Sequence, residues 1–340
     1  MLEISRKHKL KNHRHELNML QSLVDIKELK KTYSSGGGLF NPKSRSVHAV
    51  DNIDLEIHKG ETLGLVGESG CGKSTLARLI IRLEKPDAGH IYYKGDNINS
   101  FPAAELKSYR SNVQMIFQDP YSSLNPRKSA VSIIREPLTI RKIGDKNERS
   151  EIVMKLMAKV GLSKEQANRY PHEFSGGQRQ RIGIARALVL KPELIIADEP
   201  VSALDVSIQA QILNLLKELK HDFGLTYLFI SHDLNVIRNM SDRVAVMYLG
   251  KIVELAANVD VYSTPLHPYT RMLLSAVPSG DPKNRKRILS IKGEARNEGE
   301  IGCNFQNRCS CKIEICAQEE PPLKRYDQER FCACHRGGSI

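Results

Sequence analysis

A glycine-rich loop between an apolar strand and a helix is the first segment whose residues could do chemistry. The run from Gly67 to Thr75 reads GESGCGKST, with TLGLVG before it and a helical pattern after it. Glycines let successive backbone N–H groups turn inward around phosphate oxygens, and the helix dipole adds to that field. Lys73 supplies a cation, and the Ser74 hydroxyl can bind Mg²⁺. The spacing predicts an ATP phosphate site made of Gly67, Glu68, Ser69, Gly70, Cys71, Gly72, Lys73, Ser74 and Thr75.

Two adjacent carboxylates follow a second apolar run. Asp198 and Glu199 come directly after the strand-like Leu194–Ala197, and His232 follows another apolar run, YLFIS. Ligands of parallel sheets gather at the carboxyl ends of the strands. There Asp198 can hold Mg²⁺, Glu199 can act as general base on a water, and His232 can contact the γ-phosphate. Each residue alone more often has a structural role, but together with a phosphate loop they predict hydrolysis.

A second candidate anion site opens another helix. The residues Phe174 to Gln178 read FSGGQ and precede the helical run RQRIGIARALVL. Ser175 is a favourable N-cap, and the two glycines leave backbone N–H groups exposed at the helix N-terminus. One nucleotide needs one phosphate cradle. The second cradle therefore predicts that Ser175, Gly176, Gly177 and Gln178 serve the nucleotide of another chain.

Strands and helices alternate along the segment that carries these residues. Such alternation indicates an α/β fold with a mainly parallel sheet covered by helices on both faces. The region from about residue 102 to 186 is rich in helical pattern, and Ser207–Phe223 is an amphipathic helix. The expected strands cover residues 22–33, a strand pair in 47–57, a hairpin in 86–98, the runs before Asp198 and His232, and a strand pair in 243–255.

In this order and at these spacings, the motifs resemble those of the ATP-binding cassette (ABC) ATPases over residues 22–260. The resemblance implies a P-loop NTPase (RecA-like) core with an N-terminal antiparallel β subdomain and an inserted helical subdomain at about 102–186. It implies that Tyr33 stacks on adenine. Gln118 would be the Q-loop residue that touches Mg²⁺ with Ser74 and Asp198. The remaining implied residues are the signature Ser175–Gln178, Asp205 of the D-loop, the catalytic Glu199 and the switch histidine His232.

The resemblance extends to one branch of that family. FQDPYSSLNPR and TPLHPYTRMLLSAVP resemble the oligopeptide/dipeptide importers, which include nickel importers, and the details resemble the F-type ATPase subunit. The resemblance implies four partner subunits: a second ABC ATPase that is a sister chain, two transmembrane permease subunits and an extracytoplasmic solute-binding protein. It places the chain at the cytoplasmic face of the cell membrane. Residues 261–340 would then be the C-terminal extension of that branch.

Six of the seven cysteines lie in the last forty residues. In a reducing compartment such clustering favours metal binding over disulfides. Some members of the importer branch carry a [4Fe–4S] cluster, and the resemblance implies that Cys303, Cys309, Cys316 and Cys334 are its ligands. Cys311 and Cys332 depart from that pattern. Zinc, and free or oxidised thiols, are the alternatives.

Composition restricts the remaining possibilities. The chain has 340 residues and a formal charge of +12, much of it in residues 6–14 and 283–287. No interleaved aromatics suggest base stacking there, so we expect no nucleic-acid partner and read residues 1–21 as a flexible basic tail. No run reaches the length needed to cross a bilayer. The alternatives to a peptide importer are an importer of nickel or another small solute, and a soluble ABC ATPase of DNA repair or translation.

Overall fold

The computed structural model describes residues 22–35, 45–276, 301–327 and 329–338. The predicted basic tail 1–21 and the basic stretch 283–287 lie outside these residues. The chain divides into two compact units that interleave along the sequence. The predicted boundaries at 22–260 and 261–340 stay predictions. Within the described residues, the first unit comprises 58–61 and 100–230, and the second comprises the described parts of 22–57, 62–99 and 231–340.

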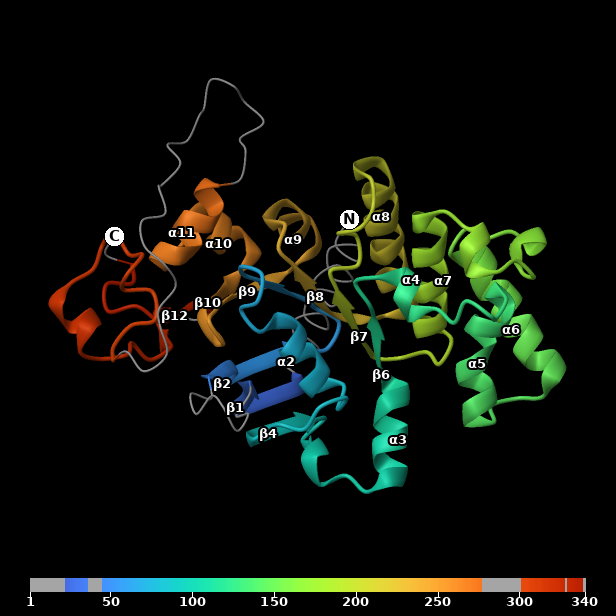
Figure 1. The fold of residues 1–340 in the computed structure, drawn as a ribbon, viewed down its shortest axis with the longest axis horizontal. Coiled ribbons are helices and arrows are strands. Elements are labelled where there is room, and N and C mark those ends of the chain that lie inside the picture. The colour runs from blue at the N-terminus through green and yellow to red at the C-terminus, as the bar shows by residue number, and fades with distance from the viewer. Residues whose placement is uncertain (1–21, 36–44, 277–300, 328, 339–340) are drawn as a thin grey trace, which may run out of the picture. The chain divides into compact units, whose positions relative to one another are not determined.

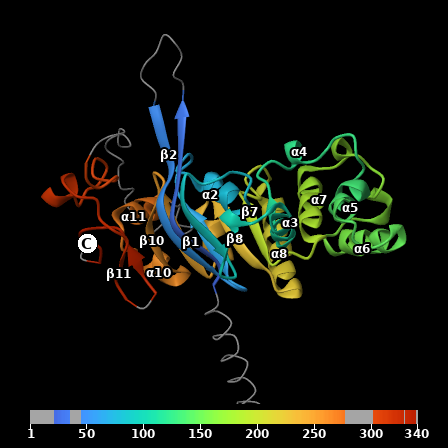
Figure 2. The same cartoon turned by 90° about the horizontal axis from the view of Figure 1, so that it is seen from below.

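The second unit contains a four-stranded sheet in the order β2-β1-β4-β5, in which β4 is antiparallel to both β1 and β5. Figure 2 shows β1 and β2 as two long neighbouring strands. The expected strand pair in 47–57 is wrong, because β2 is one strand that stays continuous through Asn52, whose φ is 54°. Asparagine adopts this left-handed conformation more readily than most residues, so the strand need not end there. The strands are β1 (Ser22–Ser35), β2 (Arg45–His58), β4 (Ala88–Tyr93) and β5 (Asp96–Asn97).

A second sheet portion of this unit has the order β11-β12-β10-β9-β3. The buried strand β3 runs parallel to β9, whereas β10 and β12 pair antiparallel with their neighbours. Because β12 pairs with β10, the C-terminal extension continues this sheet. The elements are β3 (Thr62–Val66), β9 (Arg243–Tyr248), β10 (Lys251–Ala257), β11 (Lys324–Arg325), β12 (Phe331–Cys332), α2 (Lys73–Ile80), α9 (Leu234–Met240), α10 (Asn258–Ser263) and α11 (Pro268–Ser275).

The first unit is built on the parallel strands β6, β7 and β8, with β7 in the middle. Figures 1 and 2 show α5, α6 and α7 packed together beside one another. Strand β6 lies inside the region predicted as helical, where four residues are too few for a periodic pattern to be recognised. The elements are α3 (Ala103–Asn112), β6 (Val113–Ile116), α4 (Pro120–Ser123), α5 (Ala130–Arg141), α6 (Lys146–Lys159), α7 (Gly176–Leu188), β7 (Leu194–Asp198), α8 (Val206–Phe223) and β8 (Thr226–Ser231).

The amphipathic pattern of α8 is confirmed. Ile212, Leu215, Leu216 and Leu219 are buried, which is the face expected from their spacing. The helix ends at Gly224, whose φ of 63° is the left-handed conformation that commonly terminates a helix. Among the described residues, no helix is both long and apolar enough to span a membrane.

Two buried polar side chains cap α11 in the second unit. The Glu254 carboxylate accepts hydrogen bonds from the backbone N–H groups of Leu266 and His267 at 2.8 and 2.9 Å. Nδ1 of His267 accepts from the N–H of Tyr269 at 3.0 Å. Burial lowers the pKa of His267 from 6.5 to about 3, against an opposing hydrogen bond with the Ala333 backbone. The histidine is therefore neutral in the folded unit.

This burial predicts a specific acid sensitivity. Between pH 6.5 and 3 the unfolded chain protonates His267 and the folded chain does not, so stability present above pH 6.5 is lost as the pH falls. From pH 7 to pH 5 the free energy of unfolding should drop by about 2 kcal/mol through this group. Denaturant titrations at both pH values measure the drop. His267→Asn keeps a capping oxygen and should remove this part of the pH dependence of the unfolding free energy. The same change at the exposed His221 should leave the pH dependence as in the wild type. An unchanged pH dependence in His267→Asn would contradict the assignment.

Candidate functional site

The phosphate loop lies where the sequence predicts it, between β3 and α2. Helix α2 begins at Lys73, whose side chain is buried. Its Nζ donates to the carbonyl oxygens of Gly67 at 2.8 Å and Glu68 at 2.9 Å. The carbonyl groups of the loop therefore hold the lysine side chain at the N-terminus of α2. A bound phosphate would replace those carbonyls as the partner of the ammonium group.

Two glycines allow the loop to lie close to neighbouring backbone. A Cβ at Gly67 would stand 2.1 Å from the carbonyl oxygen of Met247, at the end of β9. A Cβ at Gly72 would stand 1.9 Å from the carbonyl oxygen of Ala49, and its φ of 109° is unfavourable for other residues. Cys71 is buried in the loop, and burial raises the pKa of its thiol. The thiol is therefore neutral, as expected for a residue whose backbone matters more than its side chain.

Tyr33 lies beside the helix that follows the loop. Its hydroxyl donates to the carboxylate of Glu84 and hydrogen bonds with the side chain of Thr75. The ring is 38% exposed, and Nζ of Lys31 lies 5.7 Å from its centroid. The second unit therefore brings Tyr33 and the loop helix together and leaves the aromatic ring accessible. Stacking on adenine stays a prediction that this geometry permits.

Gln118, Asp198 and Glu199 lie at the carboxyl ends of parallel strands in the first unit. Nε2 of Gln118, which follows β6, donates to Oε2 of Glu199 at 3.0 Å. Glu199 follows β7 with a φ of 46°, and its N–H donates to the carbonyl of Ile230 at 2.9 Å. Such left-handed backbone in a non-glycine residue is unfavourable and commonly marks functional positions. Asp198, immediately before it, is buried at the end of β7.

The predicted signature caps α7. The Ser175 hydroxyl accepts from the N–H of Gln178 at 3.3 Å, and the Gln178 side chain accepts from the N–H of Ser175 at 3.1 Å. This reciprocal pair is a capping box, so the N-cap prediction is confirmed. A Cβ at Gly177 would stand 2.5 Å from Cγ2 of Ile208 in α8, which explains this glycine by packing. Ser175 and Gly176 are exposed to solvent.

The remaining predicted residues are divided between the two units. Tyr33, the loop with Ser74, and the exposed His232 belong to the second unit. Gln118, the signature, Asp198 and Glu199 belong to the first unit, as does Asp205, the N-cap residue of α8. The grouping of Ser74, Gln118 and Asp198 around Mg²⁺ therefore stays a prediction.

The described residues of the cysteine-rich tail give no support to the predicted metal site. Burial, together with the neighbouring thiols of Cys316, Cys334 and Cys309, raises the pKa of Cys303 to about 11, so these four thiols lie near one another. Nevertheless, within the described residues no group of three or more histidine, cysteine or acidic side chains is arranged to hold a metal ion. A metal would require thiolates. The predicted [4Fe–4S] cluster finds no support in this arrangement, and Cys71 and the six tail cysteines are unpaired.

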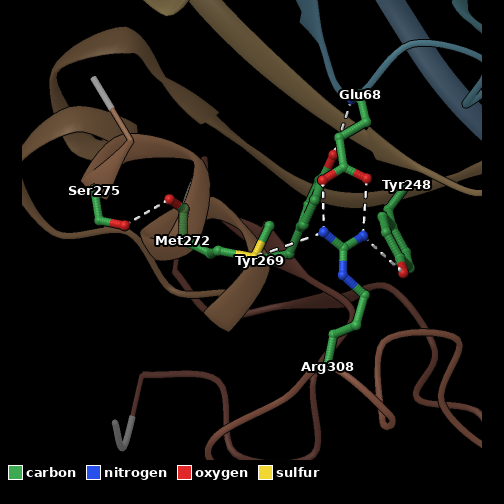
Figure 3. A network of polar contacts seen from close by, with 6 residues as sticks. All are labelled: Glu68, Tyr248, Tyr269, Met272, Ser275 and Arg308. Carbon is green, nitrogen blue, oxygen red and sulfur yellow. Dashed lines mark hydrogen bonds and ion pairs between the residues drawn. The ribbon is translucent and has the colours of Figure 1, made fainter. Parts of the chain in front are cut away.

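One ion pair at the phosphate loop could not be predicted from the sequence. Arg308 of the tail forms a bidentate ion pair with Glu68, the second residue of the loop (Figure 3). The two residues are 240 positions apart, and neither stands in a pattern that indicates the other. Only the fold of the second unit reveals the contact.

Two families match different parts of the chain. Residues 50–202 match the family described as ABC transporter, and residues 253–316 match the family described as oligopeptide/dipeptide transporter, C-terminal region. The first match includes the phosphate loop and the signature, and extends to the residues that follow β7. The second includes α11, Arg308 and the first cysteines of the tail.

Similar proteins extend these matches over nearly the whole chain. The oligopeptide transport ATP-binding protein AppF of Bacillus subtilis is 53% identical, over 93% of this chain and 97% of that protein. The dipeptide transport ATP-binding protein DppF of Escherichia coli is 46% identical, over 92% and 93%. A structure of the ATP-binding cassette MJ0796 bound to ADP and Pi has a TM-score of 0.62 at 32% identity, covering 69% of this chain and 98% of that one.

The chain therefore belongs to the ABC transporter family and shares its ATP-binding cassette fold. Within that family it belongs with the ATP-binding proteins of oligopeptide and dipeptide transport, because the likeness continues through the C-terminal region. The predicted α/β fold, with an antiparallel β subdomain and a helical insertion, is confirmed.

The close approach at Gly67 makes a testable prediction. Gly67→Ala places a methyl group against the Met247 carbonyl, so the loop must move and its N–H groups lose their alignment. We expect the Kd for MgATP to rise at least about tenfold. Equilibrium titration with a non-hydrolysable ATP analogue measures it. Gly183→Ala in α7, where no atom lies within 4 Å, is the matched control; equal affinities of the two variants would refute the packing argument.

Proposed function

We propose that this chain is the ATP-hydrolysing subunit that powers import of oligopeptides or dipeptides across the cytoplasmic membrane. The observation that carries the proposal is the continuous likeness to peptide-transport ATP-binding proteins, which includes both the cassette and the C-terminal region. ATP and Mg²⁺ are the cofactors. The loop 67–75 binds the phosphates and Tyr33 stacks on the adenine.

Residues at the carboxyl ends of the strands catalyse ATP hydrolysis. Glu199 is the general base for the attacking water, and its hydrogen bond from Gln118 orients the carboxylate. Gln118 also couples the nucleotide site to the membrane subunits, so its position can transmit to them whether ATP is bound or hydrolysed. Asp198 and Ser74 hold Mg²⁺ together with Gln118, and His232 contacts the γ-phosphate.

Two such subunits clamp two ATP molecules head to tail. The signature Ser175–Gln178 lies at a helix N-terminus where Ser175 and Gly176 are exposed, so it can receive the phosphates of a partner's nucleotide. Asp205 stands at the start of α8 and belongs to the same contact. The second ATPase is a sister chain, and the assembly is completed by two permease subunits and an extracytoplasmic solute-binding protein. This places the chain at the cytoplasmic face of the membrane.

The iron–sulfur cluster is not needed for this function. It rests only on the resemblance of Cys303, Cys309, Cys316 and Cys334 to ligands in other members of the branch. Iron analysis and a visible spectrum of anaerobically purified protein decide it. Iron at four atoms per chain would support the cluster, and protein free of iron would reject it.

The role of Glu199 can be tested directly. Glu199→Gln keeps the size of the side chain and removes the base, so we expect ATP turnover to fall at least about 100-fold while ATP binding persists. Steady-state phosphate release and analogue binding measure the two properties. Glu218→Gln, an exposed position on α8, should keep normal turnover. Near-normal turnover in Glu199→Gln would rule out the assigned base.

A further inference from the structure

The tail of the second unit contacts the phosphate loop through one guanidinium group. Nη1 and Nη2 of Arg308 donate to the two carboxylate oxygens of Glu68 at 2.8 and 2.7 Å. Nη1 also lies 3.4 Å from the Tyr248 hydroxyl, and Figure 3 shows the guanidinium directed into this group of side chains. The Arg308 side chain is 7% exposed and that of Glu68 is 37% exposed. A bidentate pair with one buried partner and one half-buried partner is stronger than a pair in which both side chains are exposed.

An aromatic cluster holds Arg308 in place. Phe305, three residues before it, is buried and contacts Tyr248 and Tyr269 with ring centroids 5.4 and 5.5 Å apart. Tyr248 ends β9 and Tyr269 lies in α11, so the tail rests on the rigid sheet and helix of the unit. The guanidinium carbon lies 5.7 Å from the Tyr248 ring and 5.9 Å from the Phe305 ring. These cation–π contacts favour one position of the guanidinium.

The same cluster fixes the backbone of the loop at Glu68. The N–H of Glu68 donates to the Tyr269 hydroxyl at 2.9 Å, so this amide faces α11. The carbonyl of Glu68 accepts from Nζ of Lys73 at 2.9 Å. The backbone N–H of Glu68 is therefore held by Tyr269 and its side chain by Arg308. Its carbonyl in turn holds Lys73, the lysine expected to bind phosphate.

The charge of Glu68 requires such a partner. Its carboxylate stands in a loop that is to bind the polyphosphate of ATP, and like charges at this range oppose binding. Arg308 neutralises the carboxylate and directs it toward the tail. Lys73, the cation of the loop, donates to the carbonyls of Gly67 and Glu68, and Arg308 is the ion-pair partner of the Glu68 carboxylate.

We infer that Arg308 is a positioning residue for ATP binding, which acts through Glu68 by neutralising its charge and holding the phosphate loop. This inference rests on the proposed ATPase function and adds a role for the C-terminal region in it. The tail is then a part of the nucleotide site, and a change in the tail alters the affinity for ATP.

The test measures ATP affinity after the pair is broken. Arg308→Met keeps much of the side-chain volume and leaves the Glu68 charge uncompensated, so we expect the Kd for a non-hydrolysable MgATP analogue to rise about tenfold. KM for ATP should rise with it while kcat changes little. Arg325→Met is the matched control, because Arg325 is exposed in the same tail and donates to the Asp327 carbonyl. Its Kd should stay within about twofold of the wild type.

A second substitution separates this role from a structural one. Glu68→Gln in the Arg308→Met background removes the uncompensated charge and should return the Kd to within about threefold of the wild type. An unchanged Kd in Arg308→Met overturns the inference, and so does a loss that Glu68→Gln does not reverse. If Arg308→Met does not fold, Arg308→Gln, which also removes the positive charge, gives the same test with the same rise of about tenfold in Kd, again reversed by Glu68→Gln.

The outcomes for the inference and for the proposed function differ. If the wild-type chain does not bind the ATP analogue, the proposed function fails before any variant is compared. If the wild type binds the analogue and all Arg308 variants bind it equally well, the function stands and the role of Arg308 is rejected.

Discussion

The close packing of the phosphate loop against neighbouring backbone is the constraint on which the rest of the second unit depends. The loop approaches the end of β9 so closely that only glycine fits at position 67, and it passes Ala49 with glycine at position 72. Strand β3 precedes the loop, and α2 follows it with the buried Lys73 in its first turn. An anion site of this type relies on aligned backbone dipoles, so its strength depends on rigid surroundings. Strand β9 and the helices beside it supply that rigidity.

In the function that we propose, the first unit supplies the groups that act on the bound nucleotide. Glu199 combines an uncommon backbone conformation with a hydrogen bond from Gln118, and both residues follow parallel strands. The signature is built differently, on a capping box at the start of α7, and its exposed residues suit a contact with another chain. A single chain therefore carries one phosphate loop and one signature, which explains why a pair of chains is the functional assembly that we propose. In this proposal, the two chains move toward each other when they clamp ATP between them.

Much of this could be predicted from the sequence, because local patterns encode it. The loop glycines, the N-cap Ser175 and the apolar face of α8 each depend on residues within a few positions, and the structure confirms all three. The failures have physical causes. The sequence suggested a strand end near Asn52, but β2 continues through this residue despite its φ of 54°. Strand β6 is too short for its pattern to stand out within a helical region. The contact between Glu68 and Arg308 depends on residues 240 positions apart, which no local pattern can reveal. The [4Fe–4S] cluster implied by the cysteine pattern finds no support among the described residues and stays a prediction.

The most direct test of the central claim is transport by the complete assembly. The chain would be combined with its sister ATPase and the two permease subunits in liposomes, with peptide and solute-binding protein on the side opposite the ATPases. We predict that MgATP drives uptake of a labelled oligopeptide or dipeptide, and that the same assembly with Glu199→Gln takes up none. ATP hydrolysis without peptide uptake, in an assembly that is intact by native mass spectrometry, would contradict the account.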